Sequence, residues 1–457
     1  MNIIEISPKE YKVIFDNPYH VFNSVDFNEL NKYKCDSVHY LIFHDGKIRM
    51  GLIIGKKSNS LLSPFSAPFG CFSFLDQHIN IKKIDEALQL LDDYSKREKI
   101  CSIKFILPPL FYSVSFLSQL INALNRNNYT LSYIDLNHIF STSFFNEKYT
   151  TIIHRNARKN LNIALMQNLV FSKTDNMDLT YSIIAKNRAF RGIPLKMTLE
   201  QVKETNRIVK HDAFIVRFKN DYIASALIYH VANKIVQVIY WGDIPEFSSM
   251  KTMNFLSYKI FEYYNNSGIE IIDIGPSSEF GLPNYSLCEF KESIGCSVES
   301  KFTFEKKILN IEFVEYSRDF LEKSHEWLND KEIKELTMTP DFTVEQQELF
   351  FNSLSIRSNY FIKGIKYNDL LIGACGLKNI TELDGEYWGY IGEKKFWGQG
   401  IGKEMLKFII EVSNEKKLDS IYLRVSPKNE RAKNLYIKYG FVVEKINEDH
   451  LFMRLRL

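Results

Sequence analysis

A glycine-rich turn between a strand and a helix is the feature that most constrains how this chain folds. It reads Trp397-Gly398-Gln399-Gly400-Ile401-Gly402, after an apolar run that ends at Ile391 and before helical periodicity from Gly402 to Asn414. Glycines let the backbone approach a ligand closely, and N–H groups at a helix N-terminus point at anions. The turn therefore predicts a phosphate site built from main-chain atoms. The alternative is a tight turn that only packs a helix on a sheet.

A second motif follows the turn and has the form of a short helix. It begins at Asn429, carries Tyr436 seven residues later and stops at Gly440-Phe441. A phenol held beside a developing thiolate can donate a proton to it. The simpler alternative is a buried aromatic side chain on a helix, and the pairing with Asn429 and the glycine turn favours catalysis.

Together, these two motifs resemble the GNAT superfamily of acetyltransferases. The likeness is greatest to the subgroups that acetylate ribosomal-protein N-termini and amino-sugar nucleotides, which often carry a Trp at the position of Trp397. The resemblance implies acetyl-coenzyme A as co-substrate, with a pyrophosphate cradled by Gly398 through Gly402. It also implies that backbone groups of Ile391 and Gly392 meet the acyl-pantetheine arm.

The same resemblance assigns the remaining roles. Asn429 is expected to contact the cofactor, and Tyr436 to act as the general acid that protonates the departing thiolate. One position departs from the family pattern, because Arg424 stands where many relatives place a Glu base. The proton acceptor for the amine is therefore left open among water and three side chains. These are Glu386, Glu393 and His325.

The N-terminal two thirds carry four shorter motifs, at residues 63–70, 154–159, 273–278 and 289–295. This set resembles the Fem-type family, which is built from two GNAT-like folds in tandem. The resemblance implies an α/β (α+β) fold of three tandem GNAT-like domains, each a mixed, mostly antiparallel sheet flanked by helices. The expected domains are residues 1–141 and 142–305 for the Fem-type halves, and 308–457 for the N-acetyltransferase.

Within this Fem-like region, Lys291 matches a lysine that the family places near its reaction centre, so a catalytic role is expected. The alternative is a surface salt bridge. Arg188 and Arg191 could also line a site, and the basic helix start at His154–Lys159 could bind phosphates of a nucleotide-linked acceptor or of a tRNA. No long charged helical hairpin interrupts the region, which weakens the tRNA reading.

Composition excludes several other classes of protein. The net charge is +3, from 58 Lys and Arg against 55 Asp and Glu, too close to neutral to indicate a nucleic-acid or membrane surface by itself. The six cysteines show no CxxC spacing, so no metal site is expected and the thiols are typical of a reduced, cytoplasmic protein. No signal peptide or membrane-spanning stretch is recognised, so no membrane insertion is expected.

The sequence thus predicts an acyl-coenzyme A-dependent N-acyltransferase that moves acetyl from acetyl-coenzyme A to a primary amine. The favoured acceptor is an amino-sugar nucleotide or another small cell-envelope precursor. Two alternatives stay open. One is aminoacyl-tRNA-dependent transfer by the Fem-like region, and the other is acetylation of protein N-termini with a non-catalytic N-terminal binding module.

Overall fold

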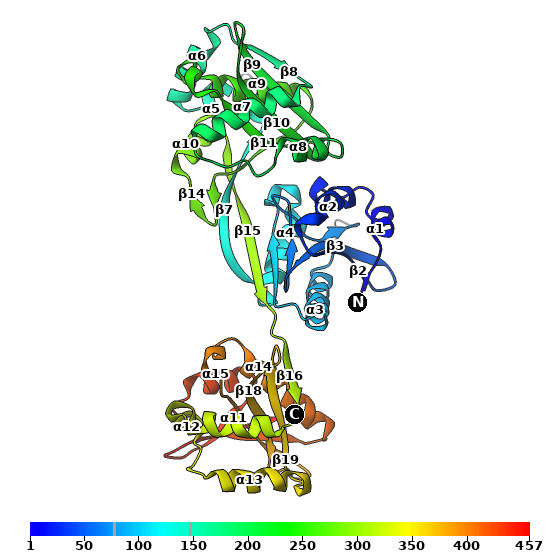
Figure 1. Cartoon of the computed structure of the whole chain (residues 1–457), viewed down its shortest axis with the longest axis vertical. Helices are drawn as coiled ribbons and strands as arrows, with labels where there is room; N and C mark the ends of the chain where they lie inside the picture. Colours follow the sequence, from blue (N-terminus) through cyan, green and yellow to red (C-terminus); the bar gives the residue numbers. More distant parts are fainter. Residues whose placement is uncertain (76–78, 146–148) are drawn as a thin grey trace. The chain divides into compact units, whose positions relative to one another are not determined.

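The computed structural model describes residues 1–75, 79–145 and 149–457. These residues form two compact units, Met1–Ile308 and Leu309–Leu457, each considered by itself (Figure 1). Both units consist of mixed, mostly antiparallel sheets flanked by helices, which confirms the predicted fold class. The boundary predicted at residues 141 and 142 falls inside the first unit and stays a prediction.

The N-terminal unit is built on one sheet, in which the described residues contribute thirteen strands. Its two halves join at β7 and β15, the long central strands that run side by side in Figure 1. Because β15 also pairs with β6, the end of the unit returns to its first half. The strands of the sheet are β1 (Asn2–Glu5), β2 (Ser37–His44), β3 (Ile48–Lys57), β4 (Ser60–Ser63), β5 (Ser73–Phe74), β6 (Ser102–Ile106), β7 (Thr130–Ser141), β8 (Val170–Lys173), β9 (His211–Phe218), β10 (Asp221–Ala232), β11 (Ile235–Asp243), β12 (Ile271–Pro276) and β15 (Ser297–Lys307).

Helices cover this sheet because their apolar residues recur on one face. In α3, for example, Ile84, Leu88 and Leu91 are fully buried, whereas the opposite face carries lysines. A small hairpin of β13 (Ser278–Glu279) and β14 (Leu282–Pro283) lies outside the sheet. The helices are α1 (Pro8–Ile14), α2 (Val25–Asn31), α3 (Ile81–Arg97), α4 (Val114–Arg126), α5 (Tyr149–Ile152), α6 (Arg155–Leu165), α7 (Met177–Phe190), α8 (Leu199–Asn206), α9 (Thr252–Asn266) and α10 (Tyr285–Ser293).

Helical periodicity in the sequence runs from Thr150 to Gln167, but this stretch does not form one helix. The chain breaks into α5 and α6 at His154, whose backbone is extended (φ −61°, ψ 152°). The His154 N–H donates to the carbonyl of Ser293, so a contact distant in sequence overrides the local preference for helix.

The C-terminal unit has a seven-stranded sheet in the order β16-β17-β18-β19-β20-β22-β21. Every pair in it is antiparallel except β19 with β20. The strands are β16 (Ile311–Val314), β17 (Phe361–Tyr367), β18 (Leu370–Lys378), β19 (Asp384–Ile391), β20 (Ser420–Val425), β21 (Val442–Ile446) and β22 (Leu451–Arg456). The helices are α11 (Arg318–Asn329), α12 (Lys331–Thr337), α13 (Val344–Ser353), α14 (Ile401–Glu415) and α15 (Glu430–Lys438).

Candidate functional site

The parallel strands β19 and β20 diverge in the middle of the C-terminal sheet. They pair only over their first three residues, ending at Glu386 opposite Tyr422. Beyond that point β19 stays bonded to β18, and β20 stays bonded to β22. The edge of β19 that faces β20 therefore has no ladder partner after Glu386 in the described chain, which leaves main-chain groups open to a ligand.

The glycine turn lies at the end of β19 and opens α14. Gly398 and Gly400 have φ of 76° and 91°, the left-handed region that favours glycine. A Cβ on Gly402 would lie 3.3 Å from Leu435 Cδ2, so this glycine lets α14 and α15 pack closely. In the described chain, the N–H groups of Gly398, Gly400, Ile401 and Gly402 donate to no protein acceptor. Four unpaired donors at a helix N-terminus form a site for an anion.

Several other groups that are expected to contact the cofactor form hydrogen bonds within the protein. Trp397 Nε1 donates to the Ile391 carbonyl at 2.8 Å, and the Gly392 N–H donates to the Ile372 carbonyl at 2.7 Å. A Cβ on Gly392 would lie 2.0 Å from the Trp327 ring, which explains the glycine by packing. Gln399 braces the turn through its Nε2, which donates to a carbonyl at 2.7 Å. Contact of Ile391 and Gly392 with the pantetheine arm stays a prediction, as does contact of Gln399 with the pyrophosphate.

Asn429 and Tyr436 lie on α15, on the side of the sheet that carries α14. Asn429 caps the helix, with Oδ1 accepting from the Ala432 N–H at 3.1 Å. Tyr436 packs against Tyr387 and Phe441, at ring-centroid distances of 6.0 and 5.7 Å. Its hydroxyl has no hydrogen-bond partner among the described residues. Burial raises the pKa of Tyr436 to about 12, so the phenol keeps its proton at neutral pH.

Glu386, one of the three candidate bases, is held in an ion pair where β19 and β20 diverge. Arg424 Nε and Nη2 donate to its two carboxylate oxygens at 2.9 and 3.0 Å. Asn379 Nδ2 donates to the same carboxylate at 2.9 Å, and Glu386 is only 3% exposed. With its lone pairs directed at these donors, Glu386 is poorly placed to accept a proton from an amine. Arg424, at the position where many relatives have a Glu base, therefore serves here to hold the Glu386 carboxylate.

Lys291 lies in the N-terminal unit, in a cavity of about 490 Å³. It is buried, and its Nζ donates to the carbonyls of Ile274, Gly275 and Pro276 at 3.2, 2.9 and 3.1 Å. Burial lowers the pKa of Lys291 to about 8. All three N–H bonds of the ammonium group are thus used to hold the end of β12, and the predicted catalytic role stays a prediction.

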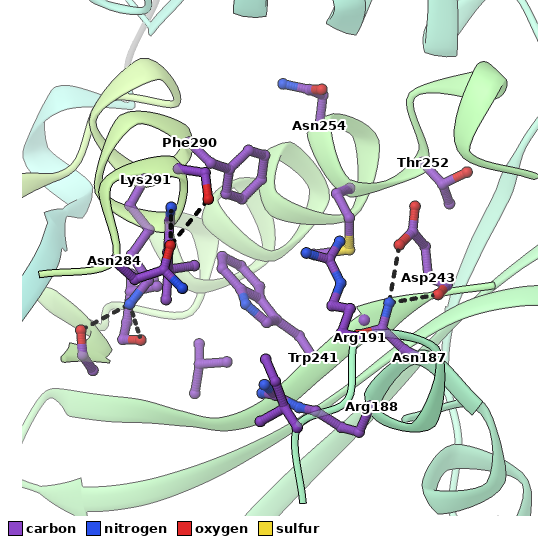
Figure 2. A pocket seen from close by; sticks show the side chains of 18 of the residues that line it. Asn187, Arg188, Arg191, Trp241, Asp243, Thr252, Asn254, Asn284, Phe290 and Lys291 are labelled. Atoms are coloured by element: carbon purple, nitrogen blue, oxygen red, sulfur yellow. Dashed lines mark hydrogen bonds between the residues drawn. The ribbon is translucent and has the colours of Figure 1, made fainter. Parts of the chain in front are cut away.

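The structure brings Arg188 and Arg191 into the same cavity as Lys291. Lys291 and Asn284 lie on one side of Trp241, and Arg191 lies on the other (Figure 2). The basic segment His154–Lys159 does not line this cavity. Its charged residues are exposed on α6, as in a solvated helix face. The lining residues that sequence reasoning missed include Trp241, Lys251 and Asn254.

Residues 322–441 match the model of the acetyltransferase (GNAT) family. The C-terminal unit is therefore a GNAT acetyltransferase domain. No curated protein matches the chain. In the described parts of the chain, no helix is long and apolar enough to cross a bilayer, and no cluster of His, Cys, Asp or Glu is arranged to hold a metal ion.

Several solved structures are similar to this chain. FemX is 13% identical, with a TM-score of 0.51, and the match covers 68% of this chain and 98% of that one. This likeness shows a shared fold. The N-acetyltransferase PseH of Campylobacter jejuni, solved with acetyl coenzyme A, is 19% identical over 32% of this chain and 98% of its own, with a TM-score of 0.27. Spermidine N-acetyltransferase of Vibrio cholerae is 22% identical over 32% and 95%, with a TM-score of 0.29.

Proposed function

We propose that the C-terminal unit transfers an acetyl group from acetyl-coenzyme A to a primary amine. The observation that carries this proposal is the set of four unpaired N–H donors from Gly398 to Gly402, beside two diverging strands. Such a turn can hold a pyrophosphate without basic side chains, and the open edge of β19 can accept an extended amide-bearing arm.

In this reaction the amine nitrogen attacks the acetyl carbonyl carbon, a C–N bond forms and the C–S bond breaks. The leaving thiolate takes the proton of the Tyr436 hydroxyl, and the phenolate regains a proton that the amine nitrogen releases to solvent. Glu386 serves to hold the two strands through Arg424, and water is the proton acceptor for the amine.

The favoured acceptor is the amine of an amino-sugar nucleotide or another cell-envelope precursor. Trp388 lies on the same face of β19 as Glu386, and its ring centroid is 5.9 Å from that of Tyr360. Its Nε1 is buried and lacks a hydrogen-bond partner in the described chain. The Arg357 guanidinium lies over the Tyr360 ring, 5.9 Å from its centroid. Aromatic rings beside an exposed guanidinium suit a ring-shaped acceptor that bears phosphate groups.

The test incubates the full chain with acetyl-coenzyme A and a panel of amino-sugar nucleotides, polyamines and peptide N-termini, and measures thiol release. We expect release with an amino-sugar nucleotide, and its loss in Gly398→Glu, which places a carboxylate in the turn. Gly46→Glu is the matched control, since Gly46 also has a positive φ and open space around it. Release on no amine of the panel, or equal rates in Gly398→Glu, would refute the proposal.

A further inference from the structure

Two segments, one in each unit, share the same order of elements. In the N-terminal unit β11 leads through η5 (Pro245–Met250) into α9 and then β12, and in the C-terminal unit β19 leads through η7 (Lys394–Phe396) into α14 and then β20. In both, the first strand pairs in parallel with the second over three residues and then diverges. The segment that carries the proposed donor turn is therefore repeated.

The spacing within the two segments also agrees. Lys251 lies sixteen residues after Ile235, where the first pairing begins, and Gly400 lies sixteen residues after Asp384. Both residues are left-handed, and each is the N-cap of a helix of 15 residues. The second strand begins thirty-six residues after the first in both segments. Lys251 thus occupies the position of Gly400.

The agreement continues into the following helix. Asn284 and Asn429 are the N-cap residues of α10 and α15, and each side chain accepts from a backbone N–H three residues later. Lys291 follows Asn284 by seven residues, as Tyr436 follows Asn429. The 490 Å³ cavity is lined by the diverging parts of β11 and β12 and by the ends of α9 and α10. It therefore lies where the other unit has its proposed donor site.

Two nearly buried polar side chains face this cavity without a protein partner. Trp241 is 9% exposed and Asn254 is 8% exposed, and both line the cavity. Among the described residues, neither the indole Nε1–H nor the Asn254 amide has a hydrogen-bond partner. The polar atoms of both side chains are accessible from the cavity, so they are free to form hydrogen bonds with a ligand there.

The charges of the cavity indicate that this ligand is an anion. The side chains of Arg188, Arg191 and Lys251 line it and form no ion pair or hydrogen bond with the described residues. Asp243 is the only acidic residue among the described lining. The left-handed backbone costs a residue such as lysine about 1 kcal/mol, a strain that a functional site can retain. Three cations against one carboxylate leave an excess of positive charge in this cavity, which favours a phosphate-bearing ligand.

We propose that this cavity is a second donor site, which binds an acyl thioester carried on a phosphorylated pantetheine carrier of the coenzyme A type. Lys251, Arg188 and Arg191 contact the phosphates, and the N–H groups of Thr252 and Met253, which have no acceptor in the described chain, add to the site. Lys291 is a positioning residue that holds β12 away from β11. The inference rests on the proposed function, because the repeated segment gives the donor its identity.

The experiment counts the coenzyme A molecules that the full chain binds, by isothermal titration with coenzyme A. We expect two sites. Lys251→Glu should weaken one of them about tenfold or more, the loss expected when a charged hydrogen bond is removed, and Gly398→Glu should remove the other. Trp241→Phe keeps an aromatic side chain, though a smaller one, and removes the N–H, and it should weaken the same site as Lys251→Glu. The matched control is Lys219→Glu, a lysine with φ of 52° in an exposed hairpin turn, which should leave both sites intact.

The outcomes separate this inference from the proposed function. A single site that only Gly398→Glu removes would overturn the second donor site, and so would two sites that ignore both Lys251→Glu and Trp241→Phe. A single site that only the cavity variants weaken would leave this inference standing and refute the C-terminal proposal. No binding at all would refute both. One coenzyme A site, together with aminoacylated RNA binding that Lys251→Glu abolishes, would assign the cavity to an RNA ester and overturn the inference.

Discussion

Replacing Tyr436 by phenylalanine removes one oxygen atom and tests the role of the general acid. The Tyr436 hydroxyl has no hydrogen-bond partner in the described chain, while the ring packs against Tyr387 and Phe441. The free energy of unfolding should therefore change by less than about 0.5 kcal/mol. Loss of a general acid should lower kcat by about 10²- to 10⁴-fold. Coenzyme A affinity should stay the same, since the phenol acts on the thiolate and not on the phosphates.

The assay measures steady-state thiol release and coenzyme A affinity for Tyr436→Phe beside Tyr439→Phe, a control on the same helix segment. Only Tyr436→Phe should lose turnover. Because the pKa of Tyr436 is raised to about 12, the wild-type kcat should show no alkaline fall from this group up to pH 10 or so. Unchanged turnover in Tyr436→Phe, or an equal loss in both variants, would refute the assignment.

Three further variants test the packing and charge of the two units. Arg424→Met leaves the buried Glu386 carboxylate without its guanidinium and should lower the free energy of unfolding of the C-terminal unit by about 2 kcal/mol, measured in urea. An unchanged free energy of unfolding would show that the ion pair does not stabilise this unit. Gly392→Ala drives a methyl group into Trp327 and should cost about 1–3 kcal/mol, seen as a lower Tm, and an unaltered Tm would contradict this packing. Burial lowers the pKa of Lys291 to about 8, so the unfolded chain binds more protons above that pH. The stability of the N-terminal unit should therefore rise by roughly 2 kcal/mol between about pH 8 and pH 10, and Lys291→Met should abolish this rise in urea unfolding at the two pH values.

Local patterns in the sequence located the elements that surround the C-terminal turn. The periodicity predicted α14, the apolar run ending at Ile391 predicted β19, and the glycines marked the position where the backbone is left-handed at Gly398 and Gly400. These features depend on neighbouring residues, so a single sequence is sufficient to predict them. The family resemblance added the expected role of Tyr436, which no pattern in the residues alone would assign.

Contacts between distant residues could not be predicted in the same way. The Glu386–Arg424 pair forms across two strands whose divergence depends on the whole sheet, so the sequence alone leaves Glu386 among the candidate bases. The clamp of Lys291 on three carbonyls of β12 depends on how α10 packs. Motif patterns in the sequence do not reveal the repeated segment, because Lys251 stands where the other turn has Gly400. Its equal spacing was present in the sequence, but it becomes meaningful only once both pairs of strands are known to diverge.

The proposed donor site requires that main-chain N–H groups of the glycine turn bind the pyrophosphate of coenzyme A. Hydrogen exchange of the backbone amides, followed by mass spectrometry with and without coenzyme A, tests it most directly. We expect slower exchange for the amides of Gly400, Ile401 and Gly402, which have no acceptor in the described chain. Unchanged exchange across this turn at saturating coenzyme A would contradict pyrophosphate binding by these amides, even if coenzyme A binds elsewhere on the chain.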